Sequence, residues 1–123
     1  MGVDTQAFLQ DTLTPDGEVA VDRLTAALHV TKAELASAFG LSRDAVSKSA
    51  RLHSRTTQAR LRDGVEIINR VLQWAGSVPQ AFAWYRAQPL PSFGDQTAED
   101  LVKQGRADAV RHHLSRIAVG GYA

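Results

Sequence analysis

The stretch RTTQARLRDGVEIINRVLQWAG, residues 55–76, is the longest helical pattern in a chain of 123 residues. Its apolar side chains recur in steps of three and four, which is the spacing of one helix face. They form two adjacent stripes, which are Leu61, Val65, Ile68, Leu72 and Ala75, and beside them Ile67, Val71, Trp74 and Val78. The pattern predicts a central core helix whose face is broader than a small chain covers, so we expect a homodimer.

The composition is that of an ordinary soluble domain, with 44% hydrophobic and 22% charged residues. Fourteen basic residues balance thirteen acidic ones, so net charge argues neither for nor against a nucleic-acid partner. The absence of cysteine excludes disulfides and thiolate metal sites. No secretory signal and no apolar run of the roughly 20 residues that a membrane span needs is present. We therefore expect a cytoplasmic protein that contacts no membrane and needs no cofactor.

Apolar spacings of three and four recur along the chain and no convincing strand is found, so the fold class is predicted to be all-α. Residues 1–20 form an N-terminal arm, in which a short apolar segment is followed by the turn signal TPDG. This arm either packs as a helix or remains loose.

Residues 21–55 contain a helix-turn-helix-like pattern. TKAE at residues 31–34 matches a capping box, in which Thr31 and Glu34 satisfy each other's backbone N–H groups. Gly40 suits the left-handed end of that helix, and Ser42 caps the next short helix, RDAVSKSA. The positions that pack the two helices hold small or apolar residues, which are Leu35, Ala36, Phe39, Leu41 and Val46.

On a DNA-reading helix, Arg43, Ser47 and Lys48 would face base edges. Arg51 and Arg55 would contact phosphates, within a basic cluster completed by His53, Arg60 and Arg62. Ser49 stands where an aliphatic residue is usual, which weakens the pattern. The alternative is a helical hairpin that only contributes to the core.

Three further helices follow the long one. PQAFAWYRAQ has Pro79 in its first turn, and PLPSFGDQ then forms a loop. TAED at residues 97–100 is a second capping box, and the helix that it opens ends near Gly105. A last helix over RADAVRHHLSRIAV, residues 106–119, precedes GGYA.

The sequence contains no recognisable active site, so we expect no enzyme. His112 and His113 are adjacent and point about 100° apart on a helix, so they do not hold one metal together. Neither a nucleophile elbow nor a phosphate loop is present.

The C-terminal third resembles the toxin-binding domain of the Xre/MbcA/ParS antitoxins. The matching features lie in order along roughly residues 74–123 of the sequence. They are Trp84 and Tyr85, Pro89 and Pro91, Gly94, Thr97, Leu101 and Val102, Gly105, and a last helix that ends in glycine and an aromatic residue. Ala98 departs from the proline usual after the threonine. Many such antitoxins carry a helix-turn-helix before this domain.

The resemblance implies a partner, a RES-domain toxin that consumes NAD as a NAD-degrading enzyme or an ADP-ribosyltransferase. The antitoxin would obstruct the NAD cleft of the toxin with its C-terminal end. In this sequence Gly120 and Gly121 would let the chain leave the last helix, and Tyr122 would fill the cleft. The carboxylate of Ala123 would pair with cationic groups of the toxin. The alternative is that GGYA is only a frayed end.

The predicted organisation has four parts. The arm 1–20 and the helix-turn-helix-like region 21–55 are followed by a long connecting and dimerising helix 56–76, and then by a toxin-binding domain with its C-terminal tail, 77–123. Arg111 and Arg116 on the last helix would contact the rim of the toxin cleft. The expected function is that of an antitoxin of a type II toxin-antitoxin system, which also represses its own operon by binding operator DNA. The competing hypothesis is a helix-turn-helix transcriptional regulator without a toxin.

Overall fold

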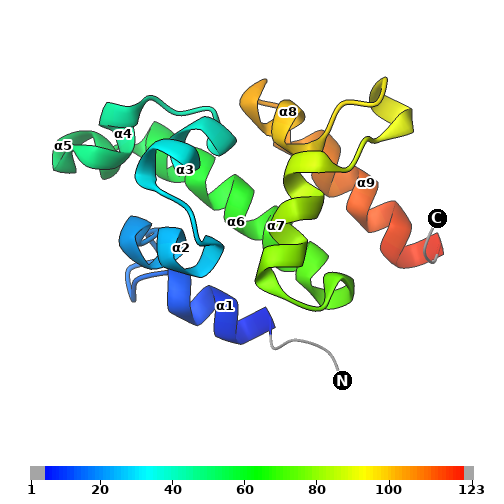
Figure 1. Cartoon of the computed structure of the whole chain (residues 1–123), viewed down its shortest axis with the longest axis horizontal. Coiled ribbons are helices and arrows are strands. Elements are labelled where there is room, and N and C mark those ends of the chain that lie inside the picture. The colour runs from blue at the N-terminus through cyan, green and yellow to red at the C-terminus, as the bar shows by residue number, and fades with distance from the viewer. Residues whose placement is uncertain (1–4, 121–123) are drawn as a thin grey trace.

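The computed structural model describes residues 5–120, and in that range every regular element is helical (Figure 1). This confirms the all-α fold class. The helices are α1 Thr5–Thr12, α2 Val21–Leu28, α3 Lys32–Phe39, α4 Arg43–Ser47, α5 Ser49–Leu52, α6 Arg55–Ala75, α7 Val78–Ala87, the 3₁₀ helix η1 Pro91–Phe93, α8 Ala98–Lys103 and α9 Ala107–Gly120.

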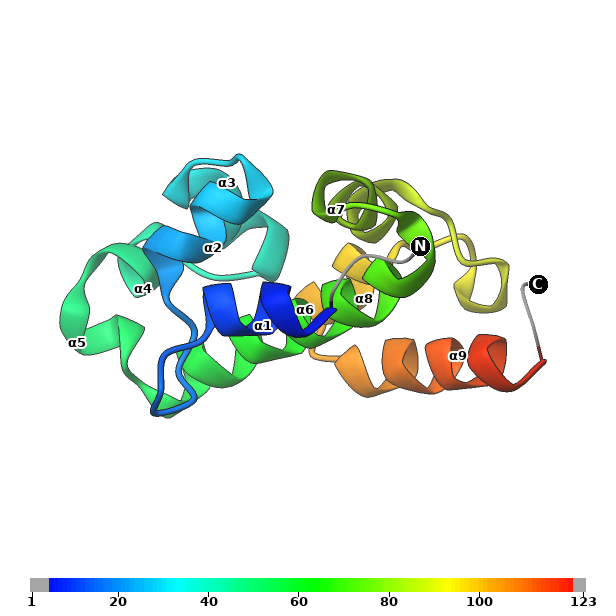
Figure 2. The ribbon, with the colours of Figure 1, turned by 90° about the horizontal axis from the view of Figure 1, so that it is seen from below.

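Helix α6 is the longest element, with 21 residues, and most of the other helices pack against it (Figures 1 and 2). Its N-cap Ser54 accepts a hydrogen bond from the backbone N–H of Thr57, and the helix ends at Gly76. Both apolar stripes face the interior, and the side chains from Leu61 to Leu72 in them are at most 1% exposed.

The chain itself covers the broad face of α6, because α1, α3, α7, α8 and α9 all contact this helix. The expectation that this face exceeds what the chain covers was therefore wrong. One helix cannot bury its own apolar face, and here segments far apart in the sequence pack against that face and bury it. The homodimer stays a prediction, but an uncovered apolar face of α6 no longer supports it.

The N-terminal arm is packed over the part that the structure describes. Phe8 of α1 is 5% exposed, and Val19 is 2% exposed. Gln58 of α6 holds the N-terminal arm in place, because its side-chain oxygen accepts a hydrogen bond of 2.8 Å from the backbone N–H of Val19. The same side chain donates to the carbonyl of Leu52 at 3.0 Å. Of the two predicted alternatives, a packed helical arm and a loose one, the structure shows the packed arm over these residues.

One hydrophobic core runs through both halves of the chain. Phe39 at the end of α3 is fully buried against Tyr85 of α7, with ring centroids 5.7 Å apart. The Tyr85 hydroxyl donates a hydrogen bond of 2.8 Å to the carbonyl of Ala38. Gly64 of α6 makes room for this contact, since a Cβ there would lie 2.5 Å from the Phe39 ring. Burial raises the pKa of Tyr85, so the hydroxyl keeps the proton that it donates.

None of the helices within residues 5–120 is both long enough and apolar enough to cross a bilayer.

Candidate functional site

The helix pair α3–α4 has the local geometry that its sequence predicted. Thr31 and Glu34 form the capping box, with both hydrogen bonds at 3.1 Å. Gly40 ends α3 in the left-handed conformation, at φ 68°, and Ser42 caps α4. The predicted packing positions lie in the interior, since Leu35, Ala36, Phe39 and Val46 are at most 1% exposed and Leu41 is half-buried.

The second helix of this pair differs from the prediction, which extended it through RDAVSKSA. Helix α4 stops at Ser47, Lys48 is extended at φ −98° and ψ 124°, and a separate turn, α5, begins at Ser49. Ser49 is exposed, so no apolar side chain holds the helix to the core at this point. The Ser47 hydroxyl donates to the carbonyl of Arg43 at 2.7 Å, and such serine bonding competes with the helix.

The side chains predicted to bind DNA all lie on the surface, but their charges are partly neutralised. Asp44, on the same helix, pairs with Lys48 at 3.7 Å and with Arg51 at 3.6 Å. Arg43 and Arg55 are exposed, and neither guanidinium has a hydrogen bond or an ion pair to a described residue. The spacing of four residues between Asp44 and Lys48 was a signal for the first pair that sequence reasoning did not use.

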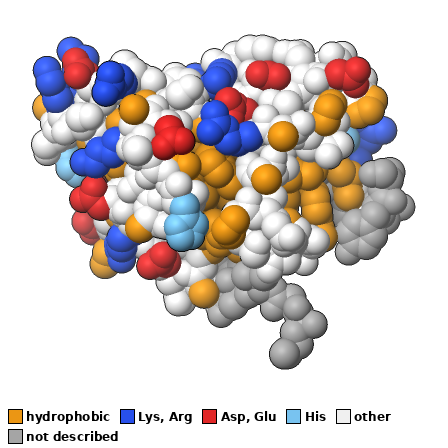
Figure 3. All heavy atoms as spheres, in the orientation of Figure 1, with side chains coloured by type: hydrophobic (Ala, Val, Ile, Leu, Met, Phe, Trp, Pro, Cys, Tyr) orange, Lys and Arg blue, Asp and Glu red, His pale blue; other side chains and the backbone are white. Residues whose placement is uncertain are grey.

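The wider basic cluster is not one patch. Arg60 donates to the carbonyl of Phe39 at 3.3 Å, while Arg62 donates to that of Gly17 at 3.4 Å. His53 bonds the Glu18 carboxylate at 2.9 Å. Arg62 and His53 thus both hold the turn at Gly17 and Glu18, whereas Arg60 holds the end of α3, so these side chains serve internal contacts. Lysine and arginine still gather with an acidic neighbour over α4 and α5, at the upper left of Figure 3.

Arg111, for which contact with a toxin stays a prediction, joins α9 to α6. Its guanidinium donates to Asp63, to Glu66 at 3.0 Å and to Asp108 at 2.8 Å, and its side chain is 24% exposed. Burial acts to lower the pKa of Arg111, but the hydrogen bonds and charges of Asp63 and Glu66 outweigh it and hold the pKa above its usual range. Arg116, five residues on, is exposed and has no carboxylate partner within the described chain.

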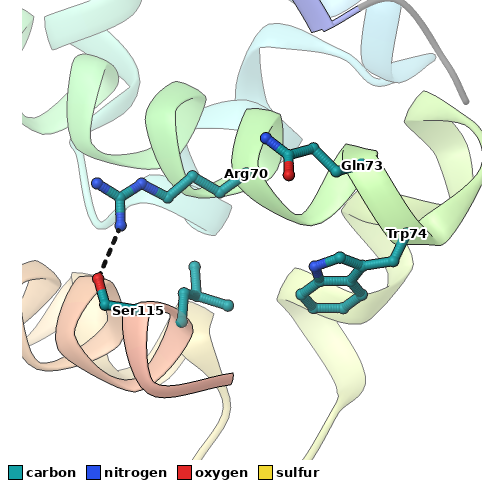
Figure 4. A pocket seen from close by; sticks show the side chains of 5 residues that line it. Arg70, Gln73, Trp74 and Ser115 are labelled. Carbon is teal, nitrogen blue, oxygen red and sulfur yellow. Dashed lines mark hydrogen bonds between the residues drawn. The ribbon is translucent and has the colours of Figure 1, made fainter. Parts of the chain in front are cut away.

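Next to this ion-pair cluster lies an apolar groove of about 500 Å³ between α7, the loop that follows it and α9. The lining side chains come from the end of α6, from α7, from the loop with η1 that follows it and from α9, and are Trp74, Trp84, Gln88, Pro89, Leu90, Pro91, Ser92, His113 and Ile117. A smaller hollow of about 190 Å³ adjoins it through the shared residue Trp74 (Figure 4). Hydrophobic side chains gather at this end of the molecule, on the right of Figure 3.

Aromatic contacts shape the groove. The rings of Trp74 and Trp84 meet edge to face at 5.7 Å, and both side chains are half-buried. Phe93 of η1 meets the ring of His113 at 6.0 Å, and the Arg106 guanidinium lies 5.8 Å from the Phe93 ring centre. Sequence reasoning assigned Trp74 to the core stripe and missed this groove. The sequence signal for the groove was the position of Trp74 near the end of the stripe, two residues before Gly76.

His113 is the titratable group of the groove lining. Burial lowers the pKa of its imidazole, and the positive charge of Arg116 lowers it further. The ring is therefore neutral at pH 7 and presents a largely apolar edge to the groove.

Helix α9 continues through Gly120, one residue beyond the predicted end. The expected departure of the chain from the helix at Gly120 and Gly121 stays a prediction. The other predicted tail residues, Gly121, Tyr122 and Ala123, lie outside the described residues.

Within residues 5–120, no group of three histidine or acidic side chains is placed to hold a metal ion. Comparisons with protein-family models, curated proteins and solved structures found no match to this chain.

Proposed function

We propose that this protein is an antitoxin that binds and inhibits a NAD-consuming RES-domain toxin through its C-terminal region. The observation that carries the proposal is the groove with two half-buried tryptophans beside α9, the last helix of the described chain. Large aromatic surfaces left open on a small protein typically mark a site of interaction. The order of motifs that resembles the Xre/MbcA/ParS antitoxins supplies the class of partner.

In this proposal α9 acts as a rigid support for the C-terminal tail. Arg111 positions the helix through Asp63 and Glu66 on α6, rather than contacting the toxin itself. Arg116, which is exposed and has no carboxylate partner in the described residues, is free to contact the rim of the toxin cleft. Tyr122 and the residues around it obstruct the NAD cleft, so the toxin no longer consumes NAD.

The test is removal of residues 121–123. The truncated protein keeps its helical circular dichroism and melting temperature, because the core lies within residues 8–114. It no longer protects NAD in a mixed assay with the toxin encoded beside it. The Tyr122→Ala variant removes the ring but keeps the length of the tail, so it tests the contribution of the ring alone. Full inhibition by the truncated protein at equal concentration would contradict this mechanism.

A second activity, repression of the operon, rests on the exposed side chains of α4 and the turn after it. Arg43, Ser47 and Lys48 would read bases, and Arg51 and Arg55 would hold phosphates. Arg43→Ala combined with Lys48→Ala should weaken binding to the upstream region in gel shifts, whereas Arg23→Ala on α2 should not. DNA binding without any toxin partner would favour the competing hypothesis of a plain regulator.

A homodimer would place two such helices on a palindromic operator and carry a toxin on each copy. Sedimentation at micromolar concentration then gives twice the chain mass of 13.3 kDa. A monomer at that concentration would remove the dimer from the proposal but leave toxin binding intact.

A further inference from the structure

We propose that the groove between α7 and α9 is a second docking site for the toxin, which holds an apolar toxin segment that also carries carboxylates. The identity of this partner rests on the proposed function. The chemistry of the segment is inferred from the groove itself, which consists entirely of described residues.

The floor of the groove fits one or two large apolar side chains. Its volume of about 500 Å³ falls within the range in which proteins enclose compact ligands. The edge-to-face tryptophans line the groove together with Ile117 of α9. The prolines Pro89 and Pro91 have no backbone N–H to leave unsatisfied when an occupant covers them. An apolar occupant can therefore bury its surface against these prolines without leaving a backbone N–H group unpaired.

The groove is preformed, because contacts within the chain hold its walls in place. Arg111 joins α9 to α6 through Asp63 and Glu66, and Arg70 of α6 reaches the Ser115 hydroxyl on α9 at 3.4 Å (Figure 4). The backbone N–H of Leu90 bonds the carbonyl of Gln96 at 2.9 Å and closes the loop. A preformed wall loses little conformational freedom when it binds, which favours affinity.

The rim determines the charge of the occupant. The carboxylates of α6 and α9, which are Asp63, Glu66 and Asp108, all bond Arg111. Arg106 and Arg116 flank the groove, and neither has a carboxylate partner in the described chain. A carboxylate on the occupant would pair with these arginines, whereas a basic segment would be repelled.

A second copy of this chain fits the groove less well. A two-fold axis places the same patch on both subunits, so groove would meet groove. Two concave surfaces leave a void, and the arginines of the two rims would approach one another. A convex, acidic segment of a different protein avoids both problems.

The tryptophans provide a direct probe, because Trp74 and Trp84 are the only two in the sequence. Antitoxin labelled with 5-fluorotryptophan gives one ¹⁹F resonance from each ring, and unlabelled toxin adds none. We expect both resonances to shift when toxin is added. They should also shift with antitoxin that lacks residues 121–123, since the groove does not depend on the tail.

Charge reversal tests the acidic character of the segment. Arg106→Glu should weaken toxin binding about tenfold, because a carboxylate would then face carboxylates, and the change leaves Arg116 intact for its proposed contact with the rim of the toxin cleft. Arg23→Glu, an exposed substitution on α2, is the matched control and should bind as the original protein does. Both variants change exposed side chains, and circular dichroism checks that each retains its helices.

The outcomes separate the two proposals. Absence of any complex between the two proteins would overturn the proposed function and this inference together. A complex that leaves both resonances unchanged would overturn the groove as a docking site while the antitoxin function stands. Shifted resonances with unchanged binding of the charge-reversed variant would overturn the acidic segment.

Discussion

The two ends of the molecule begin their helices in the same way but present different surfaces. Helix α3 starts with the box formed by Thr31 and Glu34, and α8 starts with the equivalent box of Thr97 and Asp100. Beyond these caps the ends diverge. Around α4 and α5 the surface is charged, whereas between α7 and α9 it is aromatic and hollow.

This difference indicates which end of the molecule is better suited to bind a partner. At the α4 end, Asp44 pairs with Lys48 and Arg51, so part of the positive charge that DNA would require is already neutralised. At the α9 end, the rings of Trp74 and Trp84 remain half-buried with no described residue to cover them fully. Protein binding therefore has stronger physical support here than DNA binding.

The largest expected effect tests whether the two ends share one core. Phe39→Ala removes a fully buried ring at the contact between α3 and α7, and should cost about 3–5 kcal/mol of unfolding free energy. Denaturation followed by tryptophan fluorescence and by circular dichroism should still give coincident transitions. Phe93→Ala, at a half-buried ring, is the control and should cost less. Two separate transitions would show that the ends are independent.

A smaller effect is expected from the ion-pair cluster beside the groove. Arg111→Met should cost about 2 kcal/mol, because the carboxylates of Asp63 and Glu66 lose a charged hydrogen-bond donor. Arg116→Met, on the exposed side of the same helix, should stay within about 0.5 kcal/mol. Urea denaturation at low salt measures both. Equal costs for the two arginines would contradict the assigned role of Arg111 in joining α9 to α6.

The helix caps allow the two ends to be compared by matched substitutions. Ser42→Ala and Thr97→Ala each remove a side-chain acceptor at a helix N-terminus, and each should cost about 1 kcal/mol. Ser42→Gly should cost only a few tenths of that, since glycine tolerates the cap conformation. Thermal denaturation is sufficient to rank them. A much larger cost at Thr97 would mean that α8 supports the groove more than its cap alone accounts for.

The smallest effect concerns pH. The folded pKa of His113 lies below its unfolded value of 6.5, so the unfolded chain binds the proton more readily. Stability contributed by the neutral ring is complete above pH 6.5 and is lost as pH falls through the folded pKa. His113→Gln should therefore flatten the acid side of the stability profile, measured by urea midpoints between pH 7.5 and 5. His112→Gln keeps His113 and should retain the original slope.

Sequence reasoning predicted local features well and non-local ones poorly. The capping boxes and the end of α3 at Gly40 were predicted correctly, because they join groups within a few positions of each other. The break at Lys48 was missed, since it depends on whether Ser49 finds a place in the core. Arg111 was assigned to a surface role because its partner Asp63 lies 48 residues away.

By itself, the sequence determined that the chain is helical and where most helices begin and end. It also determined which face of α6 is apolar, because spacing and capping act over one or two turns. Only the tertiary structure decided what covers that face and what remains open. The contacts of α6 with α1, α7 and α9 bury its stripes, and they leave Trp74 beside Trp84 at the edge of the core. The physical reason is that burial is shared among segments distant in sequence, so no single segment specifies it.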